Sequence, residues 1–150
     1  MENANPKNAQ QIKLPSSLIN GTILIVDDIS FYNSLVTQSL SLYGFTGTIV
    51  YASSVKEAIE KIRISLDSGK MFDLIISDLH LSDAKGSDLV KHVRLNKVTE
   101  NIPFILMTTD SEHKSILSAL ECGIDHYVIK PINADNLFNS IIFSWKKRNN

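Results

Sequence analysis

Five short apolar runs, rich in Ile and Val, divide this chain of 150 residues. They cover Thr22–Val26, Thr48–Tyr51, Phe72–Ser77, Phe104–Met107 and Tyr127–Ile129. Runs this short, separated by helix-like segments, are typical of parallel strands that are buried on both faces. The alternation predicts an α/β fold: a doubly wound, five-stranded parallel sheet with five helices.

Helix ends can be placed between these runs. The predicted helices run from Ser30 to about Tyr43, from Ser53 or Ser54 to about Leu66, from about Ser87 to Asn96, from Ser111 to Glu121, and from about Ala134 to Arg148. Ser30 is placed to cap the first helix, and Ser54 and Glu57 have the spacing of a capping box. Gly44 and Gly123 supply left-handed stops.

The ends of the chain differ from its centre. Residues 1–20 are rich in Asn, Gln, Ser and Pro, so we expect a flexible N-terminal arm. Residues 21–148 should form one domain and residues 149–150 a short tail. Nothing of domain size follows the last helix, so we expect no output domain on this chain.

Composition argues against several partners. The formal net charge is −1, so no large basic field would recruit nucleic acid directly or bind anionic lipid. No apolar stretch approaches the ~20 residues that cross a bilayer, and the polar segment Met1–Gln11 does not resemble a signal peptide. The single cysteine, Cys122, fits a reducing compartment. We therefore expect a cytoplasmic protein without a membrane partner.

Charged residues follow three of the apolar runs. Asp27 and Asp28 come after the first run, Asp78 after the third and Lys130 after the fifth. In an open parallel sheet, ligands bind at the carboxyl ends of the strands, so these side chains should meet. Clustered carboxylates repel one another unless a cation lies among them. The sequence therefore predicts a divalent-metal site with a lysine beside it.

These residue types suit Mg²⁺ (or Mn²⁺), which prefers oxygen ligands and often binds a phosphate as well. We expect Asp28 and Asp78 to bind the metal directly and Asp27 to bind through water. The backbone carbonyl of His80 would complete the protein ligands. A carboxylate can attack phosphorus, and the metal, Lys130 and a hydroxyl would then neutralise the phosphoryl oxygens.

Thr108, directly after the fourth run, is placed to supply that hydroxyl. Asp78 is the preferred nucleophile because it stands alone on the central strand, whereas the adjacent Asp27 and Asp28 fit a metal-binding pair. Taken singly, each Asp could cap a helix, Lys130 could begin a loop, and Thr108 could be a buried hydroxyl bonded to backbone. Their combination favours the phosphoryl site.

The order of these motifs matches a known family. The matching segments are Val26-Asp27-Asp28, Asp73–Asp78, Gly86, Ile102–Thr108 and Tyr127–Pro131. Over about Gly21 to Lys147 the chain resembles a receiver domain of the response regulators of two-component and phosphorelay signalling. The resemblance implies the flavodoxin-like receiver fold, in a stand-alone receiver similar to chemotaxis regulators.

The resemblance also implies a role for each residue. Asp78 is the phosphoacceptor, Asp27 and Asp28 are the metal pair, Lys130 is the phosphate-binding lysine, Thr108 is the switch hydroxyl and Tyr127 is the switch aromatic. The implied partners are a histidine kinase or histidine phosphotransfer protein and a downstream protein target. Such a chain would catalyse its own phosphorylation and dephosphorylation rather than act as a conventional enzyme. Without the resemblance, Tyr127 could simply fill space at the sheet edge.

The chain departs from the family pattern at two places. Leu81-Ser82 stands where the family usually has Met-Pro, so we expect a more mobile loop. Thr109 replaces the usual Ala, and we expect it to change rates rather than abolish the reaction. His80 and Asp110 lie next to the site, where their side chains can help or hinder hydrolysis.

The last helix offers a possible interaction surface. Its predicted core-facing stripe is Leu137, Phe138, Ile141, Ile142 and Trp145. Phe143 falls almost opposite this stripe and should be exposed. In the receiver family, the fourth helix, fifth strand and fifth helix commonly meet partners or a second copy, as in a homodimer. We expect Phe143 and Tyr127 to contribute to that face.

Three other functions fit parts of the pattern. A haloacid-dehalogenase-type phosphatase would need a second Asp where the chain has His80. A flavodoxin-type flavin or nucleotide site would need a Ser/Thr/Gly-rich loop where the chain has Asp27-Asp28. A degenerate, non-phosphorylated interaction module is left open, although the complete acidic set and Lys130 argue against it.

Overall fold

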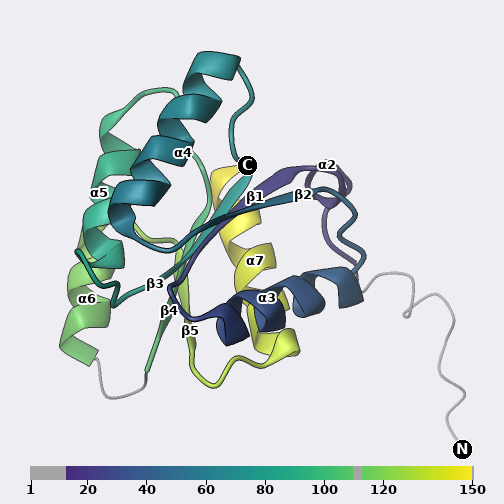
Figure 1. The fold of residues 1–150 in the computed structure, drawn as a ribbon. Helices are drawn as coiled ribbons and strands as arrows, with labels where there is room; N and C mark the ends of the chain where they lie inside the picture. Colours follow the sequence, from purple (N-terminus) through teal and green to yellow (C-terminus); the bar gives the residue numbers. More distant parts are fainter. Residues whose placement is uncertain (1–12, 110–112, 150) are drawn as a thin grey trace, which may run out of the picture.

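In the computed structural model, the described residues are 13–109 and 113–149. Five parallel strands form one sheet, as predicted, and their order is β2-β1-β3-β4-β5 (Figure 1). The strands are β1 (Thr22–Val26), β2 (Thr48–Ala52), β3 (Leu74–Asp78), β4 (Phe104–Thr108) and β5 (His126–Ile129). The described helices are α2 (Ser16–Ile19), α3 (Ser30–Leu42), α4 (Val55–Ser68), α5 (Gly86–Leu95), α6 (His113–Cys122) and α7 (Ala134–Arg148).

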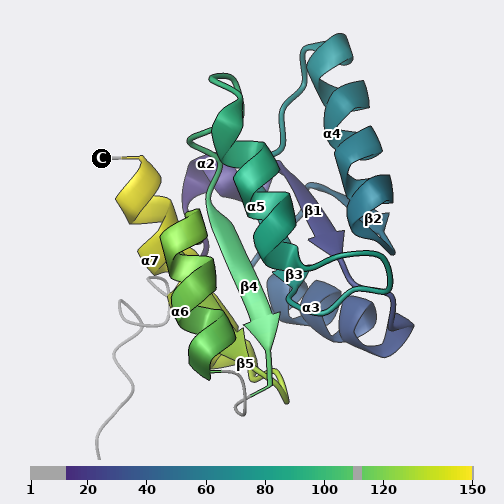
Figure 2. The same cartoon turned by 90° about the vertical axis from the view of Figure 1, so that its left-hand side faces the viewer.

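Helices cover both faces of the sheet. Helices α3 and α7 lie on one face, and α4, α5 and α6 lie on the other (Figures 1 and 2). Successive strand residues alternate between the two resulting cores: in β1, Leu24 packs beneath α4 and α5, whereas Ile23 and Ile25 face α3 and α7. Burial on both sides explains why the strand sequences are continuously apolar rather than alternating.

Parallel pairing aligns the ends of the strands that carry the charged residues. Val26 of β1 pairs with Ser77 of β3, one residue before Asp78. Thr108 of β4 pairs with Ile129 of β5, one residue before Lys130. The carboxyl ends of β1, β3, β4 and β5 therefore lie along one edge of the sheet.

The predicted arm and helix number were wrong for residues 13–20. These residues include α2, a sixth described helix, and they bury Leu14 and Leu18 at 3% and 0% exposure in the core with α3 and α7. The Leu14 N–H donates to the Tyr43 carbonyl at 3.2 Å. Burial of the Leu14 and Leu18 side chains thus holds this segment on the domain, although its polar composition predicted a flexible arm. The rest of the predicted arm, residues 1–12, lies outside the described residues.

Helix caps follow the sequence in part. The capping prediction is confirmed at Ser54, whose hydroxyl accepts the Glu57 N–H at 3.0 Å. The Glu57 carboxylate accepts a hydrogen bond from the N–H of Ser53, not from that of Ser54. Ser30 does not cap α3; it is the first helical residue, and the cap residue is Ile29. The predicted start of α6 at residue 111 lies outside the described residues.

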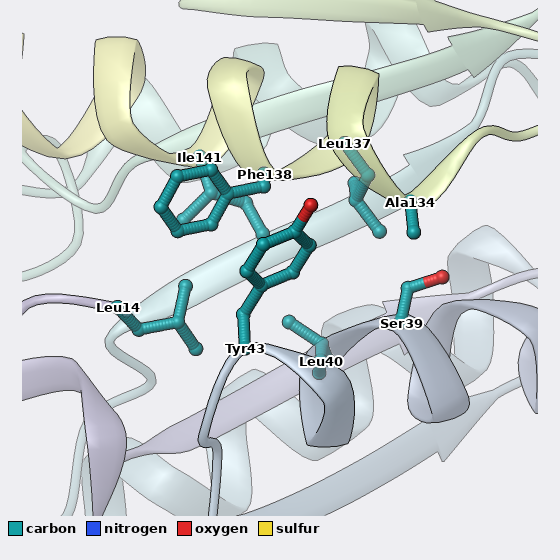
Figure 3. Close-up of a pocket in the computed structure, with 8 residues that line it drawn as sticks. All are labelled: Leu14, Ser39, Leu40, Tyr43, Ala134, Leu137, Phe138 and Ile141. Carbon is teal, nitrogen blue, oxygen red and sulfur yellow. The ribbon is translucent and has the colours of Figure 1, made fainter. Parts of the chain in front are cut away.

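An aromatic pair fills a small pocket between α3 and α7 (Figure 3). The ring of Tyr43 stacks on Phe138 with centroids 4.2 Å apart. The Tyr43 hydroxyl donates to the Asp135 carboxylate, which raises the pKa of that phenol. The pocket is lined by Leu14, Ser39, Leu40, Tyr43, Ala134, Leu137, Phe138 and Ile141. Leu14, which lies in the segment predicted to be an arm, therefore packs together with α3 and α7.

The inward face of α7 is rotated from the predicted stripe. Leu137 and Ile141 are buried as expected, but Phe138, Ile142 and Trp145 are only half-buried. The small polar residues Ser140 and Ser144 occupy the buried positions instead. Their hydroxyls find partners there; that of Ser144 donates to the Ser140 carbonyl at 2.8 Å. Satisfied hydroxyls can be buried at low cost, which hydrophobic periodicity does not register.

Candidate functional site

Three carboxylates converge at the carboxyl edge of the sheet. Asp27, Asp28 and Asp78 each offer one oxygen, and these oxygens lie within 4.8 Å of one another. Asp27 and Asp78 are buried, whereas Asp28 is exposed. The predicted acidic cluster is therefore present, and its all-oxygen donor set fits a hard divalent cation such as Mg²⁺.

Lys130 joins two members of this cluster. Its Nζ lies 3.2 Å from Asp27 Oδ2 and 3.2 Å from Asp78 Oδ2. The side chain of Lys130 is only 7% exposed. One ammonium shared by two buried carboxylates offsets part of their mutual repulsion. The predicted meeting of Lys130 with the acidic residues is confirmed.

Asp27 is the most enclosed of the three acids. Burial raises the pKa of its carboxyl, and the nearby Asp78 charge acts in the same direction. The Ile29 N–H, which donates to Asp27 Oδ1 at 2.9 Å, and the Lys130 ammonium oppose this shift. A buried carboxylate with a raised pKa lacks enough positive charge around it, and a bound cation would supply that charge.

Thr108, the predicted hydroxyl residue, lies at the carboxyl end of β4, on the same edge of the sheet as Asp78. It is the last residue of β4 and is 2% exposed. Its Oγ1 makes a long hydrogen bond of 3.3 Å to the Thr109 carbonyl. Thr109 is exposed beside it, and Asp110 lies outside the described residues.

A glycine allows α5 to begin against the end of β3. A Cβ atom on Gly86 would lie 2.4 Å from the Asp78 carbonyl oxygen and 2.8 Å from Leu106 Cδ1. The Gly86 N–H donates to the Leu79 carbonyl at 2.7 Å. Any larger residue would therefore push α5 away from the backbone that carries Asp78.

The loop between β3 and α5 has anchors that the sequence did not reveal. The Asp83 carboxylate accepts the N–H groups of Val55 and Lys56 at 3.0 and 2.9 Å, at the start of α4. These hydrogen bonds lower the pKa of Asp83, and the bond from the Lys56 N–H has the largest effect. Leu81 packs against the core beneath α4 and α5. His80 lies exposed on this loop, and the metal-binding role of its carbonyl stays a prediction.

The predicted switch aromatic lies at the edge of the sheet. Tyr127 is half-buried and Phe143 is 52% exposed, as expected for Phe143. The ring of His126 lies between them, with centroids 5.6 Å from Tyr127 and 5.1 Å from Phe143. Its Nδ1 is 2.8 Å from the Ser140 hydroxyl. His126 is therefore a packed residue of this edge.

Two further residues were not singled out from the sequence. The ring of Tyr32 lies over Lys130, with Nζ 3.8 Å from the ring centroid. Asp125 is buried at the opposite end of the sheet, where it accepts hydrogen bonds from Arg94 and Arg148. Burial lowers the pKa of Arg94 to about 10, which leaves it charged at neutral pH. Neither residue belongs to a recognisable sequence motif, because each contacts side chains that are distant in the sequence.

The chain is similar in sequence to receiver domains and to chemotaxis proteins. Residues 23–142 match the family model described as the response regulator receiver domain. The chain is 31% identical over 109 residues to the chemotaxis protein CheY1 of Helicobacter pylori, covering 73% of this chain and 84% of that protein. It is also 31% identical over 119 residues to the chemotaxis protein CheY of Pseudomonas aeruginosa, covering 79% and 91%.

Solved structures agree with the sequence relatives. A two-component response regulator from Clostridium difficile is similar at a TM-score of 0.71 and 31% identity, covering 87% of this chain and 100% of that one. A putative response regulator from Chloroflexus aurantiacus gives a TM-score of 0.72 at 25% identity, covering 83% and 98%. No described helix is long and apolar enough to span a membrane. This chain belongs to the response regulator receiver domain family of two-component signalling.

Proposed function

We propose that this receiver accepts a phosphoryl group on Asp78 in a Mg²⁺-dependent reaction. The observation that carries the proposal is the shared lysine: Lys130 Nζ bridges Asp78 and Asp27 at 3.2 Å, beside Asp28. The donor would be a phosphohistidine of a histidine kinase or of a histidine phosphotransfer protein. The phosphorylated chain would then bind a downstream protein target or pass the group on.

The acidic residues would have two roles, metal binding and nucleophilic attack. Asp27, Asp28 and Asp78, with the His80 carbonyl, would hold Mg²⁺, which neutralises charge on the transferring phosphoryl group. An Asp78 carboxylate oxygen attacks phosphorus and forms an acyl phosphate. The phosphorus–nitrogen bond to the donor histidine breaks, and the imidazole leaves with the electron pair and takes up a proton.

Two further residues would respond to the new phosphoryl group. The Lys130 ammonium exchanges its contact with the Asp78 carboxylate for a phosphoryl oxygen. The Thr108 hydroxyl, now on the Thr109 carbonyl at 3.3 Å, is free to donate to another oxygen because that bond is long. Movement of Thr108 would open space that Tyr127 can enter, which biases the edge formed by β5 and α7 between two arrangements.

Intact-mass measurement with a small phosphodonor tests this function. We expect the wild-type chain to gain one phosphoryl group with Mg²⁺ and none after chelation. Asp78→Asn should gain none, whereas the control Asp67→Asn, which changes an exposed α4 residue, should react like wild type. A wild-type chain that stays unmodified, or an Asp78→Asn chain that reacts equally well, contradicts the proposal.

A further inference from the structure

The Lys130 ammonium has an aromatic partner in addition to its two carboxylates. Nζ lies 3.8 Å from the centroid of the Tyr32 ring, and it lies 3.2 Å from oxygens of Asp27 and Asp78. The Tyr32 side chain is half-buried and packs against the core beneath α3 and α7. Because Lys130 is 7% exposed, the ring replaces water as a partner of the ammonium, which is the setting in which cation–π attraction is strongest.

The segment that positions Asp27 also positions this ring. The Ile29 N–H donates to Asp27 Oδ1 at 2.9 Å, and the Ile29 carbonyl accepts the Tyr32 N–H at 3.1 Å. Phe31 packs edge-on against Tyr32, with centroids 5.4 Å apart. The first turn of α3 therefore fixes a carboxylate and a ring face on the same ammonium.

We propose that Tyr32 is a positioning residue, which holds the Lys130 ammonium at the site during phosphorylation of Asp78. This inference rests on the proposed function. The contact between Lys130 and Asp78 must change when Asp78 is phosphorylated, but the contact with Tyr32 does not depend on the charge of Asp78. A lysine has a long, flexible stem. The ring confines its ammonium, so that only a short movement brings it to a phosphoryl oxygen.

A spectroscopic measurement tests the contact itself. Protons held over a ring face are shifted upfield, so the Lys130 Cε protons should resonate upfield of ordinary lysines in wild type, with their signal identified by its loss in Lys130→Met. The shift should persist in Tyr32→Phe and disappear in Tyr32→Leu. A wild-type Lys130 signal at the ordinary lysine position overturns the proposal, whether or not the chain is phosphorylated.

A kinetic series with a small phosphodonor and Mg²⁺ tests the consequence. Tyr32→Leu should react about two- to thirty-fold more slowly than wild type, the range that a cation–π contact supports. Tyr32→Phe, which keeps the ring, should react within about twofold of wild type. Tyr51→Leu is the matched control, because it removes a tyrosine ring that is 43% exposed on β2; its rate should not change. Equal rates in Tyr32→Leu and wild type overturn the proposal.

A fluorinated ring separates the cation–π contact from packing, even where Tyr32→Leu fails to fold. Trifluorophenylalanine at position 32 nearly keeps the shape of Phe but removes the negative ring face. It should react more slowly than Tyr32→Phe, and equal rates for the two contradict the proposal. If wild type itself gains no phosphoryl group, the proposed function fails; if wild type reacts and the ring variants all match it, only this inference fails.

Discussion

Burial makes the negative charge of the Asp27 carboxylate less favourable in the folded protein than in the unfolded chain. Its pKa is raised above the ordinary value of 3.8, chiefly by burial and against the effects of Ile29 and Lys130. Between the ordinary pKa and the raised one, the folded protein binds more protons than the unfolded chain. Its stability therefore falls as pH rises through this window, and the cost is fully present above the raised pKa.

Replacement of Asp27 by Asn should relieve this cost. Without divalent cations at neutral pH, we expect Asp27→Asn to unfold with a free energy on the order of 1 kcal/mol higher than wild type. The difference should shrink as pH falls toward the ordinary pKa of Asp, because wild-type Asp27 then becomes protonated. Thermal melts across this pH range measure it. A variant that is less stable than wild type at neutral pH would show that the contacts with Lys130 and Ile29 outweigh burial.

At the scale of single residues, the rule that ligands bind at the carboxyl ends of parallel strands predicted the charged residues of the site, but not the residues that contact them. Asp27, Asp28, Asp78 and Lys130 could be predicted because each directly follows an apolar run, and parallel strands align such positions. The contact of the Tyr32 ring with Lys130 could not be predicted, because the two residues are about one hundred positions apart in the sequence and an aromatic residue in a helix usually packs in the core.

Among the elements, α2 gives the sharpest test of the corrected boundary of the domain. Leu18 is fully buried, so Leu18→Ala should lower the free energy of unfolding by about 2–5 kcal/mol. Leu42→Ala, at a position 71% exposed on α3, is the matched control and should have little effect. Chemical denaturation measures both. Equal, small effects would mean that residues 13–20 behave as the flexible arm predicted from composition.

A buried carboxylate ties α5 and α7 to the sheet. Asp125 accepts hydrogen bonds from Arg94 at 3.1 Å, from Arg148 at 2.7 Å and from the Phe104 N–H at 2.9 Å. Removal of one partner leaves buried charges uncompensated, so Asp125→Ala should cost about 3–5 kcal/mol of stability. Asp67→Ala breaks an exposed pair with Arg63 and should cost little. Similar losses in the two variants would contradict the central role of Asp125.

The strands and most helices could be predicted because local signals agreed with the fold. Continuous apolar runs matched strands that are buried on both faces, and the cap at Ser54 matched its hydrogen bond. Helix α2 was missed because it has only four residues, too few for a periodic pattern. The rotation of α7 was missed because Ser140 and Ser144 are buried through their hydrogen bonds rather than through hydrophobicity.

At the scale of the whole molecule, apolar side chains remain exposed along α6, β5 and α7. They are Leu117, Leu120, Ile129 and Phe143, each at least 39% exposed. The ring of His126 links Phe143 to Tyr127, the predicted switch aromatic. Contact of this face with a partner or a second copy stays a prediction.

Phe143→Ala tests that prediction. If the face supports self-association after phosphorylation, the variant should shift sedimentation toward monomer relative to wild type under the same phosphodonor and Mg²⁺ conditions. Leu95→Ala, on α5 outside this face and 86% exposed, is the control and should sediment like wild type. Unchanged self-association and unchanged binding to an identified target in Phe143→Ala would remove Phe143 from the interaction surface.

In the proposed reaction Asp78, among three neighbouring carboxylates, carries the phosphoryl group. Borohydride reduces an acyl phosphate to an alcohol and so converts a phosphorylated Asp to homoserine, whose position peptide mass spectrometry can read. After reaction with a phosphodonor and Mg²⁺, we expect homoserine at position 78 and none at positions 27 or 28. Homoserine at position 27 or 28 instead, or at no position of a chain that has gained a phosphoryl group, would contradict the assignment of Asp78 as the phosphoacceptor.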